Sequence, residues 1–366
     1  MTNIIHCADL HISKAEEEYS LSVLDNIVQV VLERKAGILL LAGDIFDTFV
    51  DADAMQHKFR DTIRELAGKC EIFYVAGNHE DHGRNGRQLR DLDLGIPGAN
   101  IFEGTDPRFT MVSRADLEFL AIPHRGNYAD YRDWGVPVKR QDRRRIAIAH
   151  GTVLEMYGYL YGQEGQEGEE KSGILDGDML AHLQVEYAAM GHIHAGKTRT
   201  IGTTHVVYPG SSRVWRIGES GPRCVVHLEL GDEICHSSVE LERAGQCRLY
   251  EAFANLDGQF ELPPDSEWRK EDMIGIDIVG LVDSADLLRA KIDEVQKRHQ
   301  SKVRDFTLNN KTNVVAGLSS NPVVARFLEV WKKYRPDPGN PEAEAIWHQA
   351  REIGLLQVQQ LIVKKA

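Results

Sequence analysis

The stretch Ile38-Leu39-Leu40-Leu41-Ala42-Gly43-Asp44 is a short apolar run that ends at a glycine and an acidic residue. The same pattern stands on either side of it: Ile4 to Ala8 leads to Asp9, and Ile72 to Ala76 leads to Gly77-Asn78-His79. Amphipathic helical patterns fill the intervals. Short apolar runs separated by helices are typical of βαβ units with a buried sheet. The sequence therefore predicts an α/β fold.

Two later motifs repeat this pattern. The run from Ile146 to Ala149 precedes His150-Gly151, and the run from Ala188 to Met190 precedes Gly191-His192-Ile193-His194. Because ligand sites of an open α/β sheet form beyond the carboxyl ends of its strands, we expect the polar residues after the runs to share one rim of the fold. These residues are Asp9, Asp44, Asn78, His150 and His192. His192 and His194 flank one residue, so on a strand both would face the same side.

The residue types on this rim favour metal chemistry. Hard divalent ions such as Mn²⁺ accept mixed carboxylate, imidazole and amide-oxygen ligands. A single carboxylate that bridges two ions holds them roughly 3.5–4 Å apart, which suits in-line displacement at a phosphate. Glycines beside the ligand candidates let backbone and substrate approach closely. The pattern therefore predicts two divalent metal ions around a phosphate group.

The composition narrows the class of protein. The 366 residues exceed one typical domain, so we expect two or three units. With 43 Lys and Arg against 56 Asp and Glu, the net charge of −13 allows a nucleic-acid surface only as a local basic patch. Five cysteines without a C-x-x-C pair argue against a disulfide framework and a thiolate zinc site. We find no signal peptide and no apolar run of about 18 residues, and therefore expect a cytoplasmic protein without a membrane span.

The ordered motifs resemble those of the calcineurin-like metallophosphoesterase superfamily. Within it, Asp44-Ile45-Phe46-Asp47, Gly77-Asn78-His79-Glu80 and Tyr208-Pro209-Gly210-Ser211 resemble the SbcD-type DNA repair nuclease subunit. The resemblance implies a four-layer αββα sandwich, followed by a small α+β cap domain and a C-terminal helical tail. The chain departs from archaeal and eukaryotic relatives at Asp47, where they usually carry a histidine.

The resemblance also implies a ligand set. Asp44 would bridge two divalent metal ions, which the family leads us to expect as Mn²⁺. The first ion would be held by Asp9, His11, Asp44 and His194. The second ion would be held by Asp44, Asn78, His150 and His192. His79, beside the second ion, would stabilise the transition state or protonate the leaving 3′ oxygen, a general-acid role that suits imidazole.

We expect three segments along the chain. Residues 1–250 would form the metallophosphoesterase (nuclease) domain, 251–312 the capping domain and 313–366 the helical tail. A strand, helix and strand pattern between 273 and 308 predicts a βαβ cap. The apolar stripes on the tail fit ordinary core packing, or docking on a partner's coiled coil as the resemblance implies, and both interpretations stay open.

Several residues outside the ligand set are further candidates. DNA phosphates could be contacted by Arg84, Arg87, Lys139 and Arg140, although a solvated face is the default interpretation of such basic runs. His124, which follows the apolar run from Phe119 to Pro123, could reach the rim, but a surface or core histidine is the better interpretation.

Three hypotheses for function remain. The leading one is a two-metal DNA exo- or endonuclease of the SbcD type that works on DNA with an SMC-like, SbcC-type ATPase subunit. Since this family often pairs subunits, a homodimer is a further hypothesis. The alternative is a phosphoesterase for small phosphodiesters, cyclic nucleotides or phosphoproteins, because the metal site does not itself read the leaving group. A binding module that has lost catalysis is disfavoured because the ligand set is complete.

Overall fold

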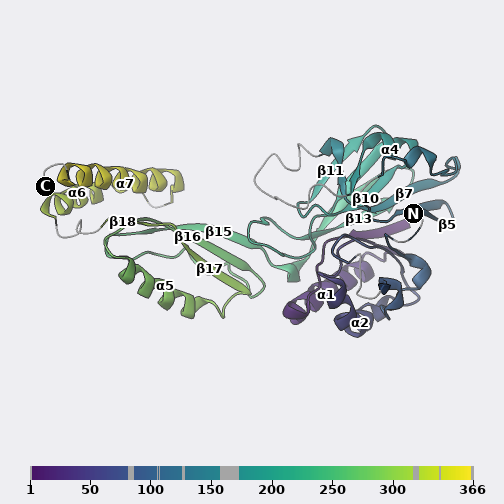
Figure 1. Cartoon of the computed structure of the whole chain (residues 1–366), viewed down its shortest axis with the longest axis horizontal. Coiled ribbons are helices and arrows are strands. Elements are labelled where there is room, and N and C mark those ends of the chain that lie inside the picture. Colours follow the sequence, from purple (N-terminus) through teal and green to yellow (C-terminus); the bar gives the residue numbers. More distant parts are fainter. Residues whose placement is uncertain are drawn as a thin grey trace. The chain divides into compact units, whose positions relative to one another are not determined.

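A computed structural model of the whole chain gives the fold (Figure 1). The structure describes residues 2–80, 86–104, 106, 108–125, 128–156, 173–315, 321–337 and 339–363. The chain divides into two compact units, Met1–Gln246 and Cys247–Ala366. The predicted segment limits at residues 250 and 312 stay a prediction.

The first sheet of the first unit has six strands in the order β14-β13-β1-β2-β3-β4. Its strands are β1 (Thr2–Cys7), β2 (Ile38–Ala42), β3 (Glu71–Val75), β4 (Ile101–Phe102), β13 (Cys224–Leu230) and β14 (Ile234–Glu240). Strands β1 to β4 run parallel, and β13 extends the sheet antiparallel to β1. Every residue of β2 is buried, which explains its unbroken apolar sequence.

The second sheet also has six strands, in the order β11-β12-β10-β7-β6-β5. They are β5 (Thr110–Arg114), β6 (Leu117–Ile122), β7 (Arg144–His150), β10 (Tyr187–Gly191), β11 (Lys197–Ile201) and β12 (Thr204–Tyr208). The four central strands run parallel, and β5 and β11 close the edges antiparallel. A separate short pair joins β8 (Thr152–Val153) to β9 (Ile174–Leu175).

The two sheets pack face to face, with helices on their outer faces (Figure 1). One apolar core holds Leu40 and Phe73 from the first sheet against Phe119 and Ile148 from the second. Helices α1 (Glu17–Glu33) and α2 (Phe49–Ile63) cover the first sheet, and α4 (Gly177–His182) covers the second. Short 3-10 helices complete the unit: η1 (Lys14–Glu16), η2 (Arg64–Leu66), η4 (Leu89–Asp91), η5 (Gly98–Asn100), η6 (Tyr131–Asp133), η7 (Leu154–Met156) and η8 (Glu242–Ala244). The predicted four-layer αββα sandwich is confirmed.

The second unit contains a parallel sheet, one crossover helix and two C-terminal helices. Its elements are β15 (Cys247–Ala254), β16 (Met273–Val282), α5 (Ala285–His299), β17 (Asp305–Asn310), β18 (Asn313–Val314), α6 (Pro322–Lys332) and α7 (Pro341–Val363). Strands β16 and β17 are parallel and joined by α5, which confirms the predicted βαβ cap. Helices α6 and α7 are held together by Trp331 and Trp347, whose stacked rings lie 3.5 Å apart and whose N–H groups each donate to the other residue's carbonyl oxygen.

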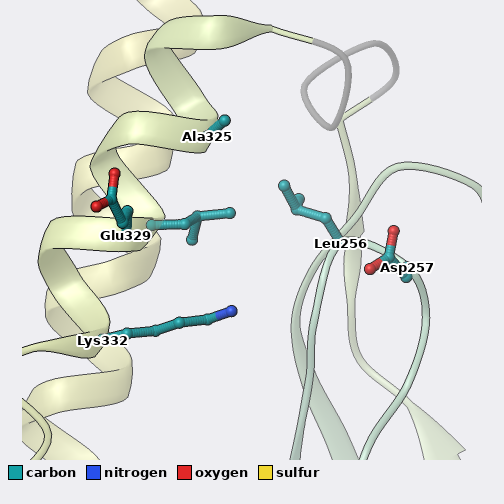
Figure 2. Close-up of a pocket in the computed structure, with 6 residues that line it drawn as sticks. Leu256, Asp257, Ala325, Glu329 and Lys332 are labelled. Atoms are coloured by element: carbon teal, nitrogen blue, oxygen red, sulfur yellow. The ribbon is translucent and has the colours of Figure 1, made fainter.

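A cavity of about 480 Å³ lies between α6 and the loop after β15. Figure 2 shows Leu256 and Lys332 projecting into it from opposite walls. Its described lining mixes apolar and charged side chains but includes no histidine or cysteine: Leu256, Asp257, Ala325, Leu328, Glu329 and Lys332. The residues predicted to carry chemistry lie in the first unit.

Candidate metal centre

The strands of the two sheets carry the predicted ligands at one shared rim. Asp9 and His11 follow β1, Asp44 follows β2 and Asn78 follows β3, while the second sheet contributes His150 from β7 and two residues beyond β10. Their side chains form two groups, Asp9–His11–His194 and Asp44–His150–His192, and a third set, His11–Asp44–His79, links them. All seven predicted ligands and His79 therefore come together, as we expected from the sequence.

The first group consists of Asp9, His11 and His194, whose ligand atoms all lie within 4.8 Å of one another. The Nε2 atoms of His11 and His194 face each other at 3.2 Å. The Asp9 carboxylate accepts the backbone N–H of His192 at 3.0 and 3.1 Å, which fixes its orientation. All three side chains are buried.

The second group consists of Asp44, His150 and His192, again within 4.8 Å. The Oδ2 atom of Asp44 lies 3.2 Å from His150 Nε2. Asn78 joins this group because its Oδ1 atom is 3.1 Å from His150 Nε2 and 3.1 Å from His192 Nδ1. Asp44 also has a ligand atom within 4.8 Å of His11, so it lies between the two groups.

The backbone at the rim adopts conformations that side chains rarely favour. Asp9, His11, Asp44 and His192 have φ angles of 51°, 45°, 50° and 95°. Such left-handed residues cost on the order of 1–3 kcal/mol each and persist where the surrounding structure holds them. They are concentrated here on four residues whose side chains converge, which is typical of a functional site.

Glycines next to the ligands allow the rim to close tightly. A Cβ atom on Gly43 would lie 2.1 Å from His150 Nδ1, and one on Gly77 would lie 2.0 Å from Asp44 Oδ1. A Cβ atom on Gly191 would lie 1.8 Å from the carbonyl oxygen of Ala42. The sequence signal of glycines beside ligands thus has a steric basis, since no larger residue fits at these three positions.

Acceptor groups outside the two groups orient the imidazole rings. The Nδ1 atom of His194 is 2.6 Å from Glu219 Oε1, and that of His150 is 2.8 Å from the Ala42 carbonyl oxygen. The Nδ1 atom of His11 lies 3.3 Å from Asp47 Oδ1. The partners of His194 and His150 hold the proton on Nδ1 and turn Nε2 toward the centre, as in metal-binding histidines generally. The contact between His11 and Asp47 does not have hydrogen-bond geometry.

Three residues that support the site could not be identified as such from the sequence. Glu219 and Trp215 belong to the loop after β12, and no spacing signal connects them to the ligands. Trp215 stacks on His11 with ring centroids 4.1 Å apart and meets His194 edge-on at 5.1 Å. Glu80, which stands inside the quoted Gly77–Glu80 motif, accepts the backbone N–H groups of Phe46 at 2.5 Å and Gly77 at 3.2 Å.

His79 lies between the two groups rather than beside the second alone, because one of its ring nitrogens is within 4.8 Å of ligand atoms of both His11 and Asp44. Its backbone N–H donates to Asp44 Oδ1 at 3.0 Å, and its ring lies 4.8 Å from that of His11. The ring Nδ1 atom is 3.1 Å from the carbonyl oxygen of Asp47, an oxygen that can only accept. Nδ1 therefore carries a proton.

Burial and charge shift the pKa values of the ligand candidates. Burial raises the pKa of Asp9 to about 6. Burial also acts to raise the pKa of Asp44, but His150 beside it outweighs this and holds the pKa below its usual range. Burial acts to lower the pKa of His150, whereas the Asp44 carboxylate raises it to about 9. In the metal-free protein Asp44 and His150 thus form a buried ion pair.

The donor set fits two divalent cations. The converging atoms are carboxylate and amide oxygens and imidazole nitrogens, with no thiolate among them. The facing Nε2 atoms of His11 and His194 cannot both donate, and a cation between them would satisfy both lone pairs. Asp44, which belongs to the second group and also has a ligand atom within 4.8 Å of His11, has the position of a bridging carboxylate.

His192 and His194 do not share one face of a strand, contrary to our prediction. Strand β10 ends at Gly191, and His192 has a φ angle of 95°, so the two histidines do not alternate along a strand. Because of this turn, the side chain of His192 lies in the second group and that of His194 lies in the first.

Of the residues predicted to contact DNA, those that the structure describes form ion pairs with carboxylates. Arg84 lies outside the described residues. Arg87 pairs with Asp53 at 3.0 Å on the exposed surface. Lys139 pairs with Glu186 at 3.2 Å and Arg140 with Asp142 at 2.8 Å.

Lys139 and Arg140 also lie at the far end of their strand. They precede β7, which begins at Arg144, whereas His150 ends it. Six steps along a strand span roughly 20 Å. These two residues therefore do not border the metal groups, and their contact with DNA stays a prediction.

The family follows from comparison with known proteins. Residues 2–196 match the Calcineurin-like phosphoesterase family, a span that holds both groups. The chain belongs to this family. It is therefore a member of a hydrolase superfamily whose enzymes cleave phosphate esters at two divalent metal ions.

Three curated proteins are similar over the larger part of this chain. SbcD, a component of the nuclease SbcCD of Bacillus subtilis, is 32% identical over 60% of this chain and 63% of its own length. The DNA double-strand break repair protein Mre11 of Thermoplasma acidophilum is 25% identical over 57% of this chain and 56% of its own length. The uncharacterized metallophosphoesterase YhaO of Bacillus subtilis is 24% identical over 66% of this chain and 60% of its own length. The chain thus spans less than two thirds of each relative.

A solved structure gives a weaker match. Purple acid phosphatase PPD1 from yellow lupin aligns with a TM-score of 0.43 and 14% identity, over 67% of this chain and 52% of that one.

None of the helices in the described part of the chain has the length and apolar character that a membrane span needs.

Proposed function

We propose that this chain is a two-metal DNA phosphodiesterase, the SbcD-like nuclease component of a complex with an SMC-like ATPase that repairs or processes DNA ends. The observation that carries the proposal is the pair of buried ligand groups that are linked through Asp44 and His11. Two ions held by one bridging carboxylate stabilise both the attacking and the leaving oxygen of an in-line displacement at phosphorus.

The proposed ligand assignment follows the two groups. Asp9, His11, Asp44 and His194 would hold one ion. Asp44, Asn78, His150 and His192 would hold the other. When bound, the ions supply the positive charge that activates water and neutralises the phosphate. Mn²⁺ is the proposed metal because it accepts this mixture of oxygen and imidazole ligands, and its identity is testable by metal replacement.

His79 is the proposed general acid. Its Nδ1–H is held by the Asp47 carbonyl oxygen, and its ring lies beside the first group. A proton on Nε2 could then pass to the leaving 3′ oxygen as the phosphodiester bond breaks. Asp47 acts through its contacts with His11 and His79.

DNA as the substrate is supported by the relatives. Two of the three are named as part of a nuclease and as a DNA double-strand break repair protein. An ATPase as partner is supported by helices α6 and α7, which bury Val324 and Leu355 against their own unit yet leave Val323, Ile346 and Ile353 exposed. A homodimer is a second proposed assembly.

A phosphoesterase for small phosphodiesters, cyclic nucleotides or phosphoproteins is the alternative function. The observation that favours it is the environment of the basic candidates. Arg87, Lys139 and Arg140 all pair with carboxylates, and the last two lie at the far end of β7. A small substrate would need no extended basic surface.

Cleavage of a labelled linear DNA duplex beside bis-p-nitrophenyl phosphate, with Mn²⁺, separates the two functions. We expect the wild-type chain to cleave both and Asp44→Ala to cleave neither. His79→Ala should lose DNA cleavage but keep metal binding, and His57→Ala on α2 is the matched control. Cleavage of the small diester alone, also after addition of an SMC-like ATPase, would overturn the nuclease proposal and favour the alternative.

A further inference from the structure

His124 stands in the row of polar residues at the rim but belongs to neither metal group. It follows β6, which pairs in parallel with β7 so that Ile122 lies opposite Ala149. Two residues beyond Ile122, the chain therefore reaches the level of the rim beside His150. The ring centroids of His124 and His150 are 6.0 Å apart, with an angle of 75° between the planes.

The His124 imidazole is buried without a hydrogen-bond partner. Only 7% of the residue is exposed, and neither ring nitrogen has a partner among the described residues. A buried imidazole usually satisfies at least one nitrogen, because an unpaired buried polar group is destabilising. His6 in the same unit illustrates the ordinary case, since its ring contacts Tyr187 Oη and the Met190 carbonyl oxygen. The unpaired ring of His124 thus points to a bound group that completes it.

The surrounding chain holds this ring in place. The Tyr128 hydroxyl donates to the Pro123 carbonyl oxygen at 3.0 Å and accepts the Arg125 backbone N–H at 2.9 Å, so it fixes both neighbours of His124. The backbone of Gly173 lies against the ring, where a Cβ atom would come within 2.9 Å of Cδ2 and Nε2. Gly173 has a φ of +70°, so glycine suits this position for two independent reasons.

We propose that His124 hydrogen-bonds a non-bridging oxygen of the substrate phosphate on the side of the second metal group. The inference rests on the proposed phosphodiesterase function of the same centre. His124 is not part of the described sets of ligand atoms that lie within 4.8 Å of one another, so we place it at the substrate phosphate rather than among the metal ligands. Phosphate oxygens are acceptors, and the imidazole N–H of His124 is a donor on this side of the centre.

The test compares wild type, His124→Ala, His124→Gln and the control His57→Ala. Calorimetry first measures Mn²⁺ binding, then the binding of inorganic phosphate to each Mn²⁺-loaded protein. We expect unchanged Mn²⁺ stoichiometry and about 10- to 100-fold weaker phosphate binding in His124→Ala, the loss typical of one hydrogen bond to a charged group. His124→Gln, whose amide can donate, should recover part of the affinity, and His57→Ala should bind as wild type does.

Two results would overturn the proposal. Unchanged phosphate affinity in a folded His124→Ala protein would show that the ring touches no phosphate oxygen. Loss of one Mn²⁺ in both His124 variants would instead make the residue part of the metal site. Failure of the proposed nuclease function would give a different result. Wild type would leave the DNA duplex intact, while phosphate binding would still differ between wild type and His124→Ala.

Discussion

The indole of Trp215 lies flat against the imidazole of His11, with ring centroids 4.1 Å apart and planes inclined by only 6°. The same loop supports His194, because Glu219 accepts the Trp215 backbone N–H at 2.8 Å through one oxygen and contacts His194 Nδ1 through the other. One loop after β12 therefore orients a histidine that follows β1 and a histidine that follows β10.

Removal of the indole should weaken metal binding without removing a ligand. In Trp215→Ala the His11 ring loses the surface that fixes its plane, so we expect Mn²⁺ affinity to fall roughly 10- to 100-fold, as for other residues that orient ligands. Trp215→Phe keeps an aromatic face and should retain most of the affinity. Calorimetric titration with Mn²⁺ measures both, and equal affinities for wild type and Trp215→Ala would contradict the predicted role.

Replacement of Asp44 should remove both ions, whereas replacement of Asp9 should remove only one. Since Asp44 lies between the two groups, Asp44→Ala is expected to abolish the binding of both ions. Asp9→Ala removes a ligand candidate from the first group only, so we expect one ion to remain bound. Metal analysis after gel filtration gives the stoichiometry directly. An Asp44→Ala protein that keeps one tight Mn²⁺ would show that the carboxylate does not bridge.

Metal affinity should rise with pH. The Asp44 carboxylate outweighs burial and raises the pKa of His150 to about 9, so the metal-free protein holds a proton there at neutral pH. An ion that binds His150 must displace this proton. Affinity should therefore increase about tenfold per pH unit for each displaced proton and level off near pH 9.

Titrations in two buffers of different ionisation enthalpy count the released protons. We expect at least one proton per loaded protein at neutral pH, from His150. Further release comes from His194, where burial acts to lower the pKa but the Glu219 carboxylate raises it, and from Asp9, whose pKa burial raises to about 6. A Mn²⁺ affinity that stays constant between about pH 6.5 and about pH 8.5 would contradict the buried ion pair of His150 with Asp44.

The ligands could be predicted because each follows a local pattern. An apolar run, a tight turn with glycine and a polar side chain occupy about eight consecutive residues, and parallel strands bring such turns to one rim. The steric fit of Gly43 and Gly77 against His150 and Asp44 explains why glycine belongs to that pattern.

The supporting residues could not be predicted because their contacts join distant parts of the chain. Trp215, in the loop after β12, meets His11, which follows β1, and Glu219 reaches His194 from the same loop, which has no periodicity. The basic run at Lys139 and Arg140 shows a second limit. Composition gives the charge, but only the direction of β7 shows that the run lies at the end opposite His150.

His6 should make the free energy of unfolding depend on pH. Burial lowers its pKa to about 3, far below the 6.5 of a free imidazole, and its ring contacts Tyr187 Oη and the Met190 carbonyl oxygen. Between these two values the unfolded chain binds a proton at His6 that the folded protein does not bind. Stability from this residue is therefore complete above about pH 6.5 and is lost as the pH falls, by about 1.4 kcal/mol per pH unit.

Replacement of His6 should remove this slope. His6→Gln has no titrating ring, so its stability relative to wild type should improve by about 2 kcal/mol between pH 6.5 and about pH 5. Urea unfolding at the two pH values measures the difference. Tyr187→Phe, which removes one contact of His6 but keeps the ring, is the matched control and should be destabilised by a similar amount at both pH values. A His6→Gln protein that loses stability on acidification as steeply as wild type would show that the buried ring is not the source of the slope.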